Sequence, residues 1–293
     1  MDLIMGHIQQ LAPTGQRVLQ LAACIGARFD LSTLALAAQQ TPQQTAVTLW
    51  ESIIAGLVIP LNDEYRLAVF DVPTNAAYKF AHDRIQQAAY ALLDEAEKQA
   101  AHQQIGRYLL QAAGADGREA AIFTILNHLN LAQPLLTTQD ERDDLAALNL
   151  IAGQKAMTSA AFLPALDYLS SGIHLVGQAA WERIYDLTMA LHTQAASAAY
   201  LSGQYAQMNR WAEEVITHGR TLLDQTPVYE TIIQASTHQN KLDEALDTAV
   251  TILKQFAVTI PRHPTRRHLL PALLQTKRLL RGKSADDLLM CRP

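Results

Sequence analysis

Residues 78–90, YKFAHDRIQQAAY, join a short β-type run directly to a helix that carries His82 and Asp83 at its start. The aromatic residues of this run are typical of a strand. A strand over 77–80 is therefore predicted, with a helix over 81–93 directly behind it. The residues on either side of this junction indicate the kind of domain to which it belongs.

Three helices are predicted before this strand. Pro13 stands at a first-turn position of a helix whose apolar residues recur at a spacing of about 3.6, and Gly26 ends that helix. A second short helix is expected over 29–38. Thr41, followed by proline, supplies the cap of a third helix, which runs to residue 56.

The next segment has the character of strands. Residues 57–61 and 65–72 are rich in β-branched and aromatic side chains, and the polar cluster between them is turn-like. Together with 77–80 they predict a small three-stranded β-wing. Three helices followed by such a wing is the order of a winged-helix domain, which we place at residues 1–95.

From residue 96 onward the sequence predicts only helices, so the expected fold class is mainly α. Residues 96–144 are assigned to connecting helices and residues 145–260 to a helical-repeat array, an α-solenoid of the tetratricopeptide (TPR) type. The repeat rests on three similar helix starts 43 (205−162) and 37 (242−205) residues apart, against about 34 for a tetratricopeptide unit. These starts are Phe162-x-x-Ala165, Tyr205-x-x-Met208 and Leu242-x-x-Ala245. An irregular α-bundle is the alternative, because helix-turn-helix spacing is a permissive pattern.

Residues 261–293 form a basic C-terminal helix and tail. Residues 262–283 contain seven Lys and Arg residues and no acid, a pattern suited to phospholipid, nucleic acid or an acidic partner. The alternative is that five leucines form the buried face of a last helix whose basic side is merely solvated, and we favour it. These leucines are Leu269, Leu270, Leu273, Leu274 and Leu280.

The composition excludes several broad classes of protein. A formal net charge of −5 gives no global reason to expect nucleic acid or an anionic membrane as partner. No apolar run approaches the ~18–20 residues that span a bilayer, so we expect no membrane span. Two cysteines form neither a disulfide framework nor a zinc set, which favours the reducing cytoplasm.

No catalytic constellation stands out. The chain lacks a Gly-x-x-x-x-Gly-Lys-Ser/Thr phosphate loop, a Gly-x-Ser-x-Gly elbow and a His-Glu-x-x-His zinc pair, so we expect no enzyme activity, no metal site and no cofactor of its own. His82 and Asp83 have two equally weighted interpretations. Asp83 caps the helix and His82 bonds a loop carbonyl, or His82 donates a hydrogen bond to a nucleotide phosphate.

Several stretches together resemble one group of signalling proteins. They are RVLQLAACIG (17–26), FDL (29–31), FAHDRIQQAAY (80–90), LNHLN (126–130) and LNLIAGQKA (148–156). The group consists of large multidomain bacterial proteins in which a Ser/Thr-kinase-like domain, a STAND-class ATPase of AAA type, TPR-like repeats, a GAF domain and a sensor histidine kinase follow one another. The chain resembles only the winged-helix and TPR-like part of such a protein.

The resemblance implies a non-catalytic regulatory and protein-interaction segment. In that family the winged helix follows a P-loop ATPase core, so ATP or ADP belongs to the parent ATPase, and the implied partners are that core, the kinase domains, and an unknown protein or small ligand on the repeats. Phe80-Ala81-His82-Asp83 is similar to the Met-His-Asp motif of related proteins, whose histidine contacts the β-phosphate of ADP; Ala81 replaces the methionine.

The alternative function is a winged-helix DNA-binding transcriptional regulator with a helical-repeat sensor domain. Its recognition helix would be the segment 43–54, which would enter the major groove. That segment contains no Lys or Arg and does contain Glu51, so nucleic acid is not the partner that we expect.

Overall fold

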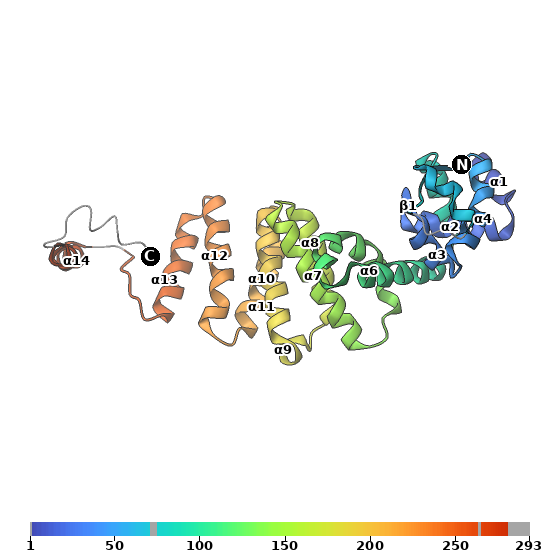
Figure 1. Cartoon of the computed structure of the whole chain (residues 1–293). Coiled ribbons are helices and arrows are strands. Elements are labelled where there is room, and N and C mark those ends of the chain that lie inside the picture. Colours follow the sequence, from blue (N-terminus) through green and yellow to red (C-terminus); the bar gives the residue numbers. More distant parts are fainter. Residues whose placement is uncertain (1, 71–74, 263–264, 281–293) are drawn as a thin grey trace. The chain divides into compact units, whose positions relative to one another are not determined.

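The computed structural model describes residues 2–70, 75–262 and 265–280, and it divides into two compact units, Met1–Ser202 and Gly203–Pro293. Figure 1 colours the elements along the chain. In the first unit they are α1 Asp2–Gln9, α2 Pro13–Ile25, β1 Arg28–Asp30, α3 Leu31–Ala38, α4 Pro42–Ile54, β2 Val58–Pro60, the 3-10 turns η1 Asp63–Arg66 and η2 Ala68–Phe70, β3 Ala77–Phe80, α5 Asp83–Ala91, α6 Glu95–Leu129, η3 Asn130–Leu135, α7 Gln139–Thr158, α8 Phe162–Val176, α9 Ala180–Arg183 and α10 Tyr185–Leu201. In the second unit they are α11 Tyr205–His218, α12 Leu222–His238, α13 Leu242–Gln255 and α14 Arg266–Leu279. The described chain is mainly helical, as predicted.

Local chemistry fixes the ends of α2, α3 and α4, although residues 29–30, expected as the start of the second helix, belong to β1 instead. Pro13 is the first residue of α2, and Gly26 closes that helix with its N–H bonded to the Ala22 carbonyl. The Asp30 side chain caps α3 by accepting the Thr33 N–H. Thr41 and Gln44 form a reciprocal capping box at the start of α4.

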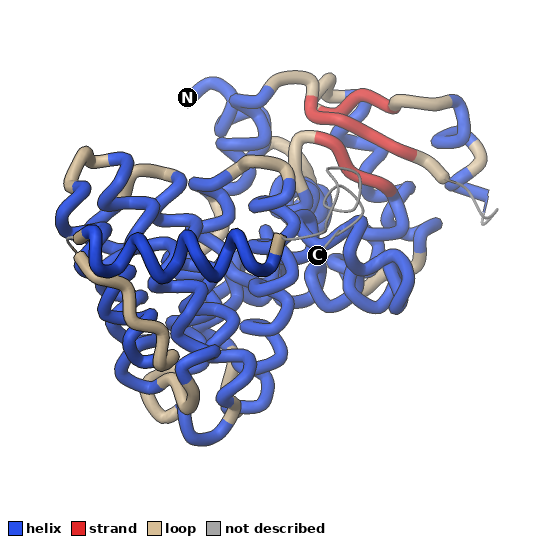
Figure 2. The backbone as a smooth tube through the Cα atoms, turned by 90° about the vertical axis from the view of Figure 1, so that its left-hand side faces the viewer, coloured by secondary structure: helices blue, strands red, loops and turns tan. Residues whose placement is uncertain are grey.

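A three-stranded antiparallel sheet has the order β1-β3-β2 (Figure 2). The strands at 58–60 and 77–80 confirm two of the predicted strands. The sequence did not predict β1, whose Arg28 pairs with Lys79 and whose Phe29 pairs with Tyr78. β1 completes the sheet on the far side of β3 from β2.

The predicted strand at 65–72 is wrong over the part that the structure describes. Residues 63–70 form the turns η1 and η2 instead, and 71–72 lie outside the described residues. Ala68 is the buried residue of this segment, whereas Leu67 and Phe70 on either side of it are exposed. Tyr65 stacks on Trp50 of α4, with ring centroids 5.9 Å apart. The turns bring Tyr65 against α4 and also bury Ala68, whereas in an extended strand residues 65 and 68 would point to opposite faces.

The long helix α6 links this sheet region to the later helices. Gly114 has φ 60° and ψ −166°, so α6 is two helical segments joined by a kink. Asn130, the first residue of η3, and Asn149 of α7 exchange two amide hydrogen bonds of 2.9 Å each. Asn149 is fully buried, so this reciprocal pair fixes the end of α6 against α7.

The three proposed repeat starts share one backbone turn. Phe162, Tyr205 and Leu242 are each the first residue of a helix. Two positions before each of these residues, the backbone has a positive φ. The residue directly before each helix start has φ near −90° and ψ near 63°. The positive-φ residues are Ala160 (55°), Gly203 (76°) and Asn240 (60°), and the second residues are Ala161, Gln204 and Lys241. The weak sequence repeat therefore corresponds to a repeated turn.

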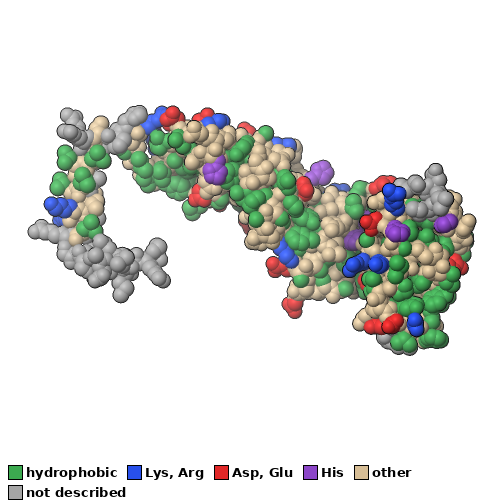
Figure 3. All heavy atoms as spheres, turned by 90° about the horizontal axis from the view of Figure 1, so that it is seen from above, with side chains coloured by type: hydrophobic (Ala, Val, Ile, Leu, Met, Phe, Trp, Pro, Cys, Tyr) green, Lys and Arg blue, Asp and Glu red, His purple; other side chains and the backbone are tan. Residues whose placement is uncertain are grey.

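The C-terminal basic segment forms the predicted helix, α14, but the predicted burial of its leucines is wrong. Leu269, Leu270, Leu273 and Leu274 of α14 and Leu280 just after it are 43–66% exposed, and Figure 3 shows hydrophobic side chains along this helix. The helix is joined to α13 by a segment in which Arg262 forms an ion pair with Asp247. No other described element of the second unit covers the leucine face. His263 and residues 281–293 lie outside the described residues.

None of the helices in the described ranges combines the length and the apolarity that crossing a bilayer requires.

Candidate functional site

His82 and Asp83 lie at the start of α5, as the sequence predicted, but neither side chain caps the helix by a hydrogen bond. His82 is the N-cap residue, in extended conformation (φ −147°, ψ 145°), and its side chain makes no capping hydrogen bond. The prediction that Asp83 caps the helix is wrong, because Asp83 is the first helical residue. Its carboxylate instead stabilises the helix N-terminus by its negative charge. Both side chains are exposed.

A shallow cleft of about 320 Å³ opens beside these two residues. Its walls come from β1, from β3 and from the start of α5. The lining residues are Ala27, Arg28, Lys79, Phe80, Ala81, His82 and Asp83. The cleft therefore gathers the side chains of three basic residue types around a helix N-terminus.

Arg28 and Lys79 are direct partners across the β1–β3 pair. Like charges that face each other on adjacent strands destabilise a sheet, so this pair costs folding free energy unless an anion lies between its members. Within residues 2–70, 75–262 and 265–280, neither side chain forms an ion pair with an acid. Asp83 is the acidic side chain in the lining.

The α5 N-terminus adds to the positive potential of the cleft. The first N–H groups of a helix lack intrahelical acceptors and carry a partial positive charge. With Arg28, Lys79 and the His82 imidazole beside them, the arrangement suits a phosphate-sized anion. It supplies donors for binding such an anion.

The sequence motif identified His82 but missed Arg28 and Lys79. Lys79 lies within the quoted stretch, yet its role depends on a strand partner 51 positions (79−28) earlier in the chain. A pairing of that separation leaves no local signal, because β1 has only three residues.

Replacing Lys79 by glutamate separates binding from stability. The change turns a repulsive cross-strand pair into an attractive one, so we expect the free energy of unfolding to rise by roughly 0.2–1 kcal/mol. We also expect the affinity for inorganic pyrophosphate to fall at least about tenfold, since a charge-assisted hydrogen bond is lost. Urea unfolding and titration calorimetry measure the two effects. Arg118→Glu, an exposed site on α6 outside the cleft, is the control, and equal pyrophosphate affinity in the wild type and Lys79→Glu would contradict the assignment.

A second surface lies on α4 and the turns that pack against it. Val47, Trp50 and Ile54 share one face of α4 and are 56%, 40% and 75% exposed. Phe70, 73% exposed, follows in η2, which the Gln43 amide joins to α4 through a 3.1 Å hydrogen bond to the Val69 carbonyl. Exposed apolar residues gathered in this way are typical of interaction surfaces.

Comparison with known proteins gives one distant relative. The hybrid signal transduction histidine kinase G of Dictyostelium discoideum is 26% identical over 303 residues, which covers 87% of this chain and 9% of that protein. The chain thus spans about a tenth of the length of the curated relative that it matches. No protein-family model matches the sequence, and no solved structure matches it. The chain is therefore similar to a small part of a signal-transduction histidine kinase.

Proposed function

We propose that the chain is a non-catalytic regulatory and protein-interaction segment of a multidomain signal-transduction ATPase and histidine kinase. Residues 1–95 act as a winged-helix domain that packs on a P-loop ATPase core and contacts its nucleotide. Residues 145–260 act as TPR-like repeats that bind a protein or a small ligand. Binding biases a closed-to-open equilibrium, which requires different affinities for the two states.

The observation that carries this proposal is the cationic cleft beside His82. Arg28, Lys79 and His82 line one cleft at a helix N-terminus, where they can bind a phosphate. A site that binds the phosphate of a nucleotide, while another domain hydrolyses that nucleotide, fits a regulatory domain. The similarity to part of a signal-transduction histidine kinase supports the same class of function.

The surface of α4 favours a protein partner over DNA, the alternative function. In a DNA-binding winged helix this helix would supply cations to the phosphate backbone. Here α4 contains no Lys or Arg, its exposed face carries Val47, Trp50 and Ile54, and Glu51 accepts the Ala12 N–H at 3.3 Å. An apolar face of this kind suits the surface of a neighbouring domain.

A gel-shift series against salt tests this choice. We expect the wild type to form no complex with duplex DNA at ~50 mM salt or above, because its α4 has no phosphate contacts that would release counterions. Val47→Lys/Ile54→Lys adds two cations to this helix and is expected to strengthen any binding to DNA. A wild-type complex whose affinity falls steeply with salt would favour the DNA-binding regulator instead.

The sequence that flanks this segment in its coding region provides the direct test of the proposal. We expect an in-frame P-loop ATPase core on the N-terminal side and a histidine kinase domain on the C-terminal side. A coding region without a P-loop would contradict the proposed coupling, although the cleft would still bind anions.

A further inference from the structure

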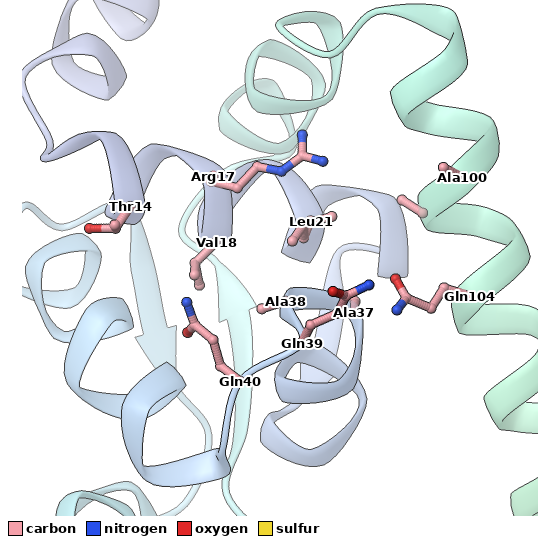
Figure 4. Close-up of a pocket in the computed structure, with 11 residues that line it drawn as sticks. Thr14, Arg17, Val18, Leu21, Ala37, Ala38, Gln39, Gln40, Ala100 and Gln104 are labelled. Carbon is pink, nitrogen blue, oxygen red and sulfur yellow. The ribbon is translucent and has the colours of Figure 1, made fainter.

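A hollow of the first unit, between α3 and the first half of α6, has a mixed lining. It has a volume of about 340 Å³, and Gln39 and Gln104 reach it from opposite walls (Figure 4). Arg17, which also lines it, is already paired with Glu97 at 2.9 Å. Such a lining of amides, alanines and a neutralised cation suits no one class of ligand. A surface whose chemistry does define a partner lies in the second unit, on α13.

The outer face of α13 carries apolar side chains that remain exposed. Ala245 and Ile252 are the buried residues of this helix, which packs on α12. Four further apolar residues recur at intervals of 4, 4 and 3 positions, so they share one face of the helix. They are Leu242 and Leu246, which are 59% and 42% exposed, and Val250 and Leu253, which are half-buried. We call these four residues the α13 stripe.

Acidic side chains flank the α13 stripe towards the start of the helix. Asp243 and Asp247 each follow a residue of the stripe and lie four positions apart, so they form one edge of it. Asp247 pairs with Arg262, beyond the end of α13, at 3.0 Å. Asp243 forms no ion pair within the described ranges of the chain. The stripe therefore suits a partner that is apolar along its middle and cationic at the end that meets Asp243.

The helix α14 has this complementary chemistry. Its four central leucines are 50–66% exposed, and Lys277 and Arg278 lie in its last turn. The leucines are Leu269, Leu270, Leu273 and Leu274. The sequence of α14 contains no acidic residue. Both helices have 14 residues, so each is about 21 Å long at ~1.5 Å per residue. The leucine face and the α13 stripe thus match in length.

The segment between the two helices is long enough for them to pack together. It runs from residue 256 to residue 265 and, fully extended, spans about 33 Å at ~3.3 Å per residue. The axes of packed helices lie only about 10 Å apart. A short connection favours antiparallel neighbours. In that arrangement the last turn of α14 lies beside the first turn of α13, so Lys277 and Arg278 meet Asp243.

We propose that the α13 stripe is a docking surface for α14 of the same chain, with the leucines on the stripe and the last-turn cations beside Asp243. Both faces are exposed in the described conformation, so docking is a closing movement of α14. The connecting segment favours this occupant over a second copy, because a short tether holds α14 at an effective concentration of about 1 mM. The inference does not depend on the anion cleft or on the proposed function.

Thiol cross-linking of the full chain tests the docking. In a Cys291→Ser background the native thiol that remains is the buried Cys24. We expect a short bismaleimide to link Leu246→Cys/Leu273→Cys within one chain at least about tenfold faster than Leu246→Cys/Gln275→Cys, because docking holds only the first thiol pair together. Gln275 is the control position, since two residues along a helix turn the side chain to the other side.

An exchange of charges tests the contact at Asp243. Asp243→Lys is expected to slow cross-linking of Leu246→Cys/Leu273→Cys, because it places like charges together. Asp243→Lys/Lys277→Glu restores an opposite-charge pair and is expected to restore the rate. Circular dichroism of each variant shows that the helices are retained.

Four results would overturn the proposal. They are equal or undetectable rates for the two thiol pairs, a rate that Asp243→Lys leaves unchanged, cross-linked dimers whose yield rises with protein concentration, and flotation of the wild-type chain with phosphatidylglycerol vesicles that Leu273→Lys abolishes. The third result would make a second copy the occupant of the stripe, and the fourth would assign the leucines to a lipid surface.

Discussion

Replacing Gly153 by valine is expected to destabilise the first unit by about 3 kcal/mol, the upper part of the usual range for overpacking a core. Gly153 lies in α7, and a Cβ atom there would come within 2.5 Å of Leu169 Cγ and 2.6 Å of Leu169 Cδ2. Leu169, in α8, is fully buried, so a shift of its side chain would disturb the close packing around it. The close approach of α7 and α8 therefore requires glycine at this position.

The size of the effect follows from two opposing terms. In an exposed helix, replacing glycine by alanine stabilises by about 1 kcal/mol. At Gly117, where an added Cβ meets only Ala113 Cβ at 3.8 Å, we expect that gain. At Gly153 the steric conflict with Leu169 outweighs it. Urea unfolding followed by circular dichroism of Gly153→Val and Gly117→Ala compares the two, and equal stability of both variants would contradict the packing of α7 on α8.

Acidification from pH 6.5 to pH 4 is expected to remove about 3 kcal/mol of stability through His128 alone. Burial, with a smaller contribution from the neighbouring His102, lowers the pKa of His128 from 6.5 to about 4. Between these values the unfolded chain binds a proton that the folded chain does not. Stability is therefore fully present above pH 6.5 and is lost as the pH falls.

The geometry explains why protonation is disfavoured here. His102 Nδ1 and His128 Nδ1 lie 2.9 Å apart, and the Tyr90 hydroxyl lies 3.1 Å from His102 Nε2. Such a chain requires a donor opposite each acceptor, so charging both rings would place two donors face to face. Burial also lowers the pKa of His102, and Glu95 opposes that shift.

Unfolding free energies at pH 7, 5.5 and 4.5 measure this effect. We expect His128→Asn, which keeps a polar partner for His102, to be less stable at pH 7 but to lose much less stability on acidification. His174→Asn, at an exposed site, is the matched control and should follow the wild type. A wild-type stability that is flat between pH 6.5 and 4.5 would show that the histidine pair is not buried as described.

Much of the local structure could be predicted because its determinants lie within one turn of each other. Pro13, Gly26 and the Thr41 capping box fix helix ends by contacts over four residues or fewer. The turns at 63–70 could not be predicted, because Tyr65, a strand-forming residue, packs on Trp50, fifteen (65−50) residues away. In such cases tertiary contacts override the local propensity to form a strand.

The same limit applies to the candidate site. The His82 motif lies within one stretch of sequence, whereas the facing of Arg28 and Lys79 arises from strand pairing. The exposed leucines of α14 show the converse: an amphipathic pattern predicts a helix, but not whether another element covers its apolar face.

The phosphorus-31 NMR spectrum of ATP mixed with the full chain tests the central claim most directly, because it reports hydrolysis and binding together. The proposed function predicts no inorganic phosphate above a protein-free sample, and a shifted or broadened β-phosphorus resonance with wild type but not with Lys79→Glu. Steady accumulation of inorganic phosphate, or β-phosphorus resonances that wild type and Lys79→Glu affect equally, would contradict it.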